Sequence, residues 1–63
     1  MTIDKIRYII GDTLTDHIQS LTFDQLKKQE EELEEEIERE PVGTARINLL
    51  YVELNFIRYR LSN

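Results

Sequence analysis

The single histidine, His17, lies close to two aspartates and is the first candidate for site chemistry. Asp12 and Asp16 are four residues apart, so a helix would place their carboxylates on one face, whereas His17 does not share that spacing. Zinc sites use three or four protein ligands, and the sequence indicates no further one; cysteine is absent. We therefore expect His17 to be a surface residue, and we expect neither a metal site nor a cofactor.

Catalytic residues are not arranged in any pattern that we can identify. Ser20 and Ser62 have no histidine and acid organised around them, and a lone histidine does not establish general-base chemistry. Gly11 and Gly43 are too sparse for a phosphate-binding loop. A catalytic carboxylate pair needs a concave, partly desolvated site, for which a few short helices leave little room. The sequence therefore favours a protein that is not an enzyme.

Residues 30–40 are rich in glutamate and are the only compositionally biased segment of the sequence. On a helix these carboxylates would cover a broad face that could bind a basic protein or imitate a phosphate surface. An ordinary solvated helix face is the other interpretation. The candidate partner-binding residues are Glu31, Glu34, Glu35 and Glu38. Thirteen acidic against eight basic side chains give a net charge of −5, which disfavours nucleic acid as a partner.

Two helices are predicted in the second part of the chain, over residues 22–40 and 44–61. Thr22 and Gln25 have the spacing of a capping box, so the first helix should begin there. Pro41 disfavours a helical conformation at the residue before it, and Thr44 can cap the second helix. Because the connection is short, the two helices should form an antiparallel hairpin. In that register Glu30 should lie near Arg58.

The N-terminal segment is predicted to form a shorter helical region broken near Gly11. Apolar residues recur there at three- and four-residue spacing, which indicates helix. Glycine can end one helix and Asp12 can cap the next. Residues 3–10 could instead form a short strand, although no partner strand is visible. The recurring residues are Ile3, Ile6, Ile10, Leu14, Ile18 and Leu21.

The last predicted helix is apolar on two opposite sides. One side would pack against the preceding helix, so the other needs a different cover, which is either the N-terminal segment or the same helix of a second chain. The second cover would give a dimeric helical bundle, and oligomerisation is a common supplement to the small core of such a short chain. The predicted self-interface consists of Leu49, Val52, Phe56 and Tyr59.

Residues 1–63 are therefore expected to form a single small all-α domain that works as a protein–protein interaction module. Self-association and a role as adaptor, inhibitor or assembly factor form the leading hypothesis. The alternative is an acidic regulator in a nucleic-acid system, either a decoy for a basic nucleic-acid-binding site or an RNA-binding dimer. Charges near the N-terminus argue against a signal peptide, and no stretch approaches the roughly 20 apolar residues of a membrane span. We expect a cytoplasmic location and no membrane partner.

Overall fold

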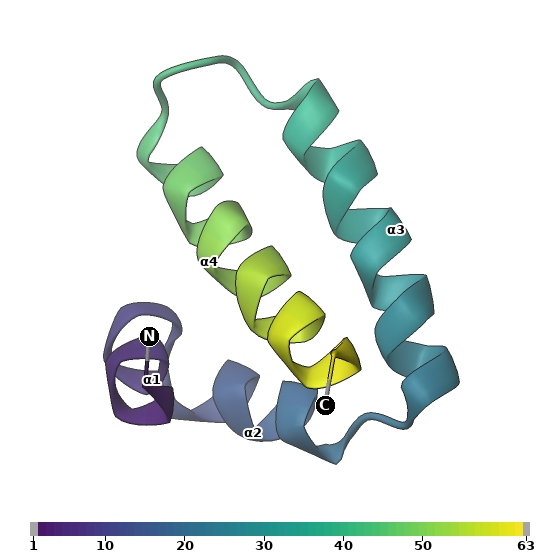
Figure 1. The fold of residues 1–63 in the computed structure, drawn as a ribbon. Helices are drawn as coiled ribbons and strands as arrows, with labels where there is room; N and C mark the ends of the chain where they lie inside the picture. Colours follow the sequence, from purple (N-terminus) through teal and green to yellow (C-terminus); the bar gives the residue numbers. More distant parts are fainter. Residues whose placement is uncertain (1, 63) are drawn as a thin grey trace.

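The computed structural model describes residues 2–62, and this part of the chain is all helical (Figure 1). Its helices are α1 (Ile3–Ile10), α2 (Asp12–Ser20), α3 (Phe23–Arg39) and α4 (Ala45–Leu61). The predicted all-α class is confirmed, as are the hairpin and the break at Gly11. Residues 3–10 form a helix, so the alternative of a short strand is wrong.

Local signals in the sequence explain where α3 begins and ends. The Thr22 side chain accepts a hydrogen bond from the backbone N–H of Gln25 at 3.3 Å, and the Gln25 side chain accepts one from the N–H of Thr22 at 2.9 Å. This is the predicted capping box. At the other end Glu40 is extended, with φ −75° and ψ 138°, because the following Pro41 excludes the helical conformation.

Two of the predicted caps work differently from the expectation. Thr44 is the residue before α4, but its hydroxyl is buried and has no hydrogen-bond partner within the described residues. Asp12 is the first residue of α2 and does not cap it; Gly11 takes the cap position without a side-chain bond. In both cases the residue type suits a cap, but neither side chain makes the cap bond, and the Asp12 carboxylate lies 3.5 Å from Arg7 instead.

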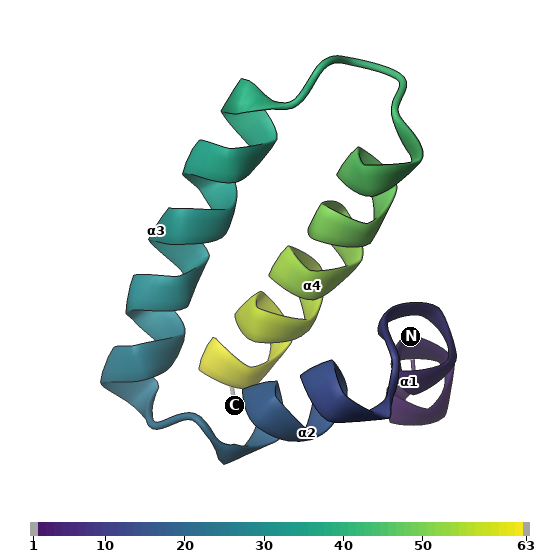
Figure 2. The ribbon, with the colours of Figure 1, turned by 180° about the vertical axis from the view of Figure 1, so that it is seen from behind.

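The two N-terminal helices meet at a corner and close the open end of the hairpin. In both views α2 lies across the C-terminal end of α4, the connection after it leads to the start of α3, and α1 turns back beside α4 (Figures 1 and 2). The corner is made at Gly11, whose φ of 94° favours glycine. Arg60 fastens α4 to α2, since its guanidinium donates a hydrogen bond to the carbonyl oxygen of Ile18 at 2.6 Å.

All four helices contribute to one apolar core. Phe56 and Ile57 are almost completely buried, and burial of each such side chain stabilises the fold by roughly 1.5–3 kcal/mol. Further apolar side chains are partly buried against this core. The core residues are Ile6, Ile18, Leu26, Leu33, Leu50, Leu54, Phe56 and Ile57.

The position of Phe56 corrects the predicted self-interface. Phe56 is only 1% exposed, because α1 packs on α4 and its Ile6 joins Phe56 in the same buried cluster. The N-terminal segment of the same chain therefore covers this part of the second apolar side of α4. Phe56 is a core residue and is not available to a second molecule.

Candidate functional site

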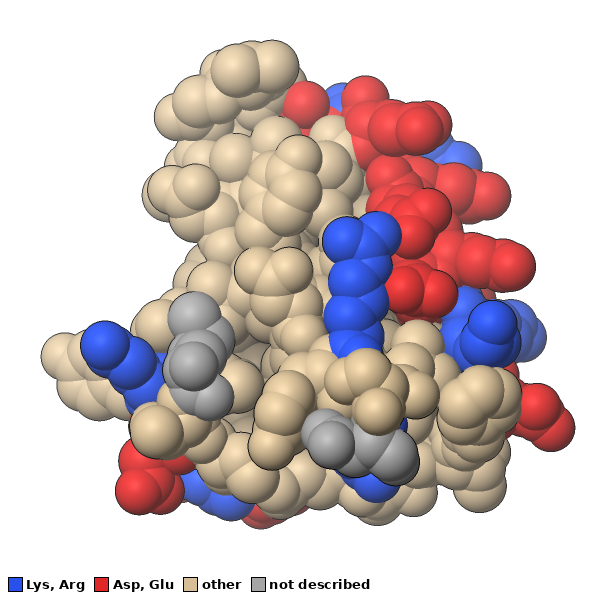
Figure 3. All heavy atoms as spheres, in the orientation of Figure 1, with Lys and Arg blue, Asp and Glu red and all other residues tan. Residues whose placement is uncertain are grey.

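Three surfaces could carry function, and the first is the predicted acidic face of α3, formed by Glu31, Glu34, Glu35 and Glu38. All four side chains are exposed. In Figure 3 carboxylates crowd the surface over α3, on the right of the view. These glutamates therefore form a continuous anionic surface, as the sequence indicated.

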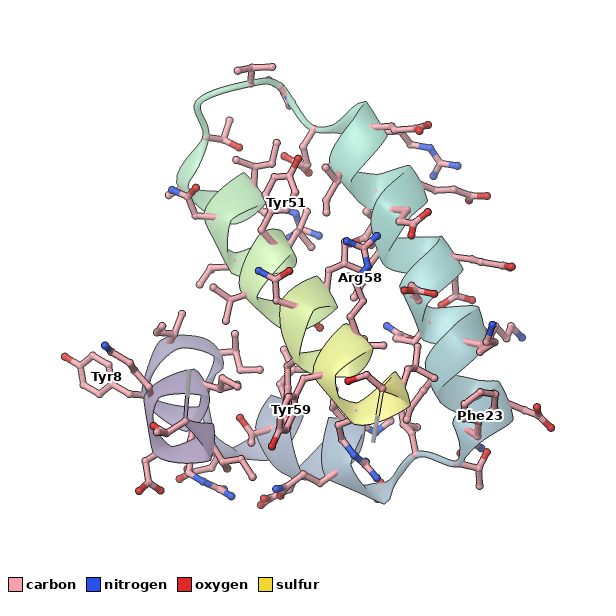
Figure 4. All side chains as sticks on the ribbon, viewed as in Figure 1. Tyr8, Phe23, Tyr51, Arg58 and Tyr59 are labelled. Carbon is pink, nitrogen blue, oxygen red and sulfur yellow. The ribbon has the colours of Figure 1, made fainter. Side chains whose placement is uncertain are left out.

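Arginines neutralise part of this acidic face. Arg58 reaches across from α4 to Glu30 at 3.1 Å and to Glu34 at 2.8 Å, which confirms the predicted Glu30–Arg58 pair (Figure 4). Arg39 lies 3.5 Å from Glu35 along α3. Exposed pairs of this kind contribute about 0–1 kcal/mol each, so their main effect is to set the register of the hairpin and to lower the net charge of the face.

The second surface is the outer face of α4, which we define by Asn48, Tyr51, Val52, Asn55 and Tyr59. None of these residues is charged, in a chain of which 33% is charged. Tyr51 is 48% and Tyr59 57% exposed. Figure 3 shows the corresponding broad uncharged surface over α4, with a basic side chain between it and the acidic surface over α3.

The charged residues of α4 point to the flanks of this face. Arg46 pairs with Glu40 at 3.0 Å and with Glu36 at 3.8 Å. Arg58 is held by α3, and Arg60 is held by the end of α2. Intramolecular pairing of the cations thus leaves the outer face to tyrosine, asparagine and valine.

The third surface is a groove between the N-terminal helices and the hairpin, which we call the α1–α4 groove. It has a volume of about 350 Å³ and receives residues from every helix. Its apolar residues include Ile9 and Leu14 on one side and Leu49 on the other. Its charged residues are Glu36, Arg46 and Glu53.

Within this groove Glu53 is partly buried. Loss of hydration raises the pKa of Glu53 above its ordinary value, and the negative charge of Glu36 raises it further. The positive charge of Arg46 opposes this shift, and His17 acts in the same direction. Within residues 2–62 no cation lies within ion-pair distance of Glu53, so Arg46 and His17 compensate its negative charge only in part.

Replacement of Glu53 by glutamine is expected to raise the melting temperature at pH 7. Because the folded protein raises the pKa of Glu53, its stabilising contribution is fully present below the ordinary value of 4.5 and is lost as the pH rises through the raised pKa. Glutamine avoids this loss, so the difference between Glu53→Gln and the parent should disappear at acidic pH. Thermal unfolding followed by circular dichroism at several pH values measures this, with the exposed Glu38→Gln as control. A difference that does not depend on pH would contradict the assigned environment.

The two aspartates near His17 form ion pairs with an arginine. Asp12 and Asp16 do share a face, but both turn to Arg7, which lies 3.5 Å and 2.9 Å from their carboxylates. The described part of the chain contains no group of three or more histidine, cysteine and acidic side chains that could hold a metal ion. The Asp12–Asp16 pair therefore fastens α1 to α2.

The α1–α4 groove and the role of Glu53 were missed by the sequence reasoning. The available signal was that Glu53 is the only acidic residue in Ala45–Leu61, in which the other charges are arginines. The predicted self-interface is also divided. Leu49 lines the groove, Phe56 is buried, Val52 is partly buried, and Tyr59 is exposed on the outer face.

No family model matches this chain, and the comparisons with curated proteins and with solved structures found no match. Across residues 2–62 no helix combines the length and the apolar character required to cross a bilayer.

Proposed function

We propose that this protein is a small helical interaction module that self-associates through the outer face of α4. The observation that carries the proposal is an exposed, uncharged face on the central helix of a strongly charged molecule. Charged residues are depleted at the centre of protein interfaces, whereas tyrosine is enriched there. A role as adaptor, inhibitor or assembly factor would follow from such binding.

The chemistry of this face suits a second copy of the chain. Tyr51 and Tyr59 offer large contact areas that lose little conformational entropy on binding, and Asn48 and Asn55 offer amides that donate and accept hydrogen bonds. A standard interface buries about 800 Å² on each partner, which is roughly a sixth of the 4570 Å² surface of this molecule. The outer face with its immediate neighbours is the largest uncharged surface visible in Figure 3.

Light scattering on a sizing column tests this proposal. We expect the mass of the parent to rise towards that of a dimer as the concentration increases. We expect Tyr51→Ala combined with Tyr59→Ala to weaken the dimer by at least roughly tenfold, because aromatic interface residues often cost more than about 1 kcal/mol when truncated. The matched control is Tyr8→Ala, since Tyr8 is 91% exposed on α1 and points away from the other helices (Figure 4). A parent that stays monomeric, or an equal effect of Tyr8→Ala, would refute self-association through this face.

A second candidate function, binding of a basic protein surface, is supported by the acidic face of α3. Glu31 and Glu38, which form no ion pair among residues 2–62, and the half-exposed Glu34 continue along one side of the helix. Binding of this kind should weaken steeply between about 50 mM and about 500 mM NaCl, whereas an interface of tyrosine and asparagine should be much less affected. The same scattering experiment, repeated at both salt concentrations with and without an added basic protein, separates the two interfaces.

A further inference from the structure

We infer that the α1–α4 groove binds a basic amphipathic segment of a partner protein, which inserts an apolar side chain between α1 and α4 and places a lysine or arginine against Glu53 and Glu36. This site is separate from the outer face of α4, so the inference does not depend on self-association. The occupant follows from the shape, the apolar walls and the charge of the groove.

The groove is apolar where α1 and α2 approach α4. Ile9 is 37% and Leu49 44% exposed, although both lie beside core residues such as Leu33 and Leu50. A volume of about 350 Å³ is at the small end of the range of about 300–1,000 Å³ that is usual for ligand sites. The space is therefore suited to an apolar side chain that approaches from a partner and covers these two residues.

The carboxylates of the groove favour a positively charged group on the bound segment. Arg46 is the cation that lines the groove, and its shorter ion pair is with Glu40, 3.0 Å away, against 3.8 Å for Glu36. Glu36 is therefore only partly compensated, and Glu53 lies beside it without an ion pair among the described residues. An incoming ammonium or guanidinium group would compensate both carboxylates, whereas an anionic segment would be repelled.

The groove also contains Glu53, whose ionised form destabilises the folded state. Dehydration and the neighbouring Glu36 both disfavour the ionised form of Glu53, and a glutamine of similar size would avoid this penalty. Ionisable groups that are partly buried without an ion-pair partner are frequent at functional sites, where a ligand can supply the partner. A bound lysine or arginine would give Glu53 the direct ion pair that the described residues do not supply.

Two synthetic peptides of about 15 residues, long enough to form a helix, are the probes for this site. Both carry the same seam of leucines; one is flanked by lysines and the other by glutamates. We expect the lysine peptide to change the NMR shifts of amides around the groove in the ¹⁵N-labelled protein, and the glutamate peptide to leave them unchanged. We also expect the pKa of Glu53, followed by carbon-13 shifts, to fall when the lysine peptide binds.

Three variants assign the binding to the groove. Glu53→Gln should weaken binding of the lysine peptide roughly tenfold, because it removes a charge-assisted contact. Leu49→Ser should weaken it roughly fivefold through loss of the apolar wall. Asp24→Asn removes the same charge at an exposed position near the start of α3, outside both the groove and the acidic face, and should change the affinity less than about twofold.

Other outcomes would overturn the inference. Equal weakening by Glu53→Gln and by the acidic-face variant Glu38→Gln, with shift changes along α3, would place binding on the acidic face. Equal binding of both peptides would show that the groove does not select a cation. No shift change at millimolar peptide, or an unchanged pKa of Glu53 in the complex, would show that the groove is not a binding site for this class of segment.

Discussion

Phe56→Ala is expected to leave a large fraction of the molecules unfolded at 25 °C. Truncation of a buried phenylalanine costs about 3–5 kcal/mol through lost burial and the cavity that remains. At about 0.05–0.15 kcal/mol per residue, a chain of 63 residues has a total stability of roughly 3–9 kcal/mol. The substitution therefore removes much or all of the stability. Urea and thermal unfolding followed by circular dichroism would measure the loss.

The matched control for this variant is Tyr59→Ala, one helical turn away on the exposed side of α4. Because Tyr59 is 57% exposed, its truncation should cost well under half as much. Since α1 covers Phe56 within one chain, the loss in Phe56→Ala should be the same at two protein concentrations about a hundredfold apart. Similar losses in the two variants, or a loss confined to high concentration, would return Phe56 to an interface between chains.

Gly11→Ala is expected to destabilise the protein by about 1–3 kcal/mol. Gly11 has φ 94° and ψ 159°, a region in which only glycine is normally found. The corner has little freedom to relax, since the Gly11 N–H donates to the carbonyl of Arg7 at 2.9 Å and its own carbonyl accepts from Thr15, at 3.1 Å from the backbone nitrogen and 2.8 Å from the hydroxyl. In a domain of this size, each kcal/mol lowers the melting temperature by about 4–8 °C.

A D-alanine at position 11 is the matched control, and a chain of this length is accessible to chemical synthesis. A Cβ atom built on Gly11 meets no other atom within 4 Å, so the expected loss in Gly11→Ala comes from the backbone dihedrals alone. D-alanine adopts positive φ without strain and should keep or slightly increase the stability of the parent. Equal losses for the two enantiomers would contradict the backbone explanation.

Much of the fold could be predicted because its signals lie within a few residues of where they act. The capping box of Thr22 and Gln25 starts α3, Pro41 ends it, and Gly11 separates α1 from α2. The short loop after Glu40 then requires an antiparallel hairpin, which brings Glu30 to Arg58. Each of these features depends on local backbone conformation or on a short connection.

The sites could be predicted only in part, because their side chains choose among partners that are distant in the sequence. The acidic face of α3 was visible as a run of glutamates. The sequence predicted that Arg58 pairs with Glu30, but not that Arg58 also pairs with Glu34 and so neutralises part of this face. Asp12 has the residue type of a cap, yet it turns to Arg7, which the corner at Gly11 brings within reach. The α1–α4 groove exists only where four helices meet.

The second apolar side of α4 shows which features the sequence determines and which depend on the tertiary structure. The sequence by itself determined the four helical segments, the hairpin and the need for a cover over Phe56, because helix periodicity and caps are local properties. Only the tertiary structure decided that α1 supplies this cover, that Tyr59 stays exposed and that Glu53 lies half-buried beside Glu36. The physical reason is that the direction in which α1 and α2 return to the hairpin depends on packing among all four helices, which local propensities do not specify.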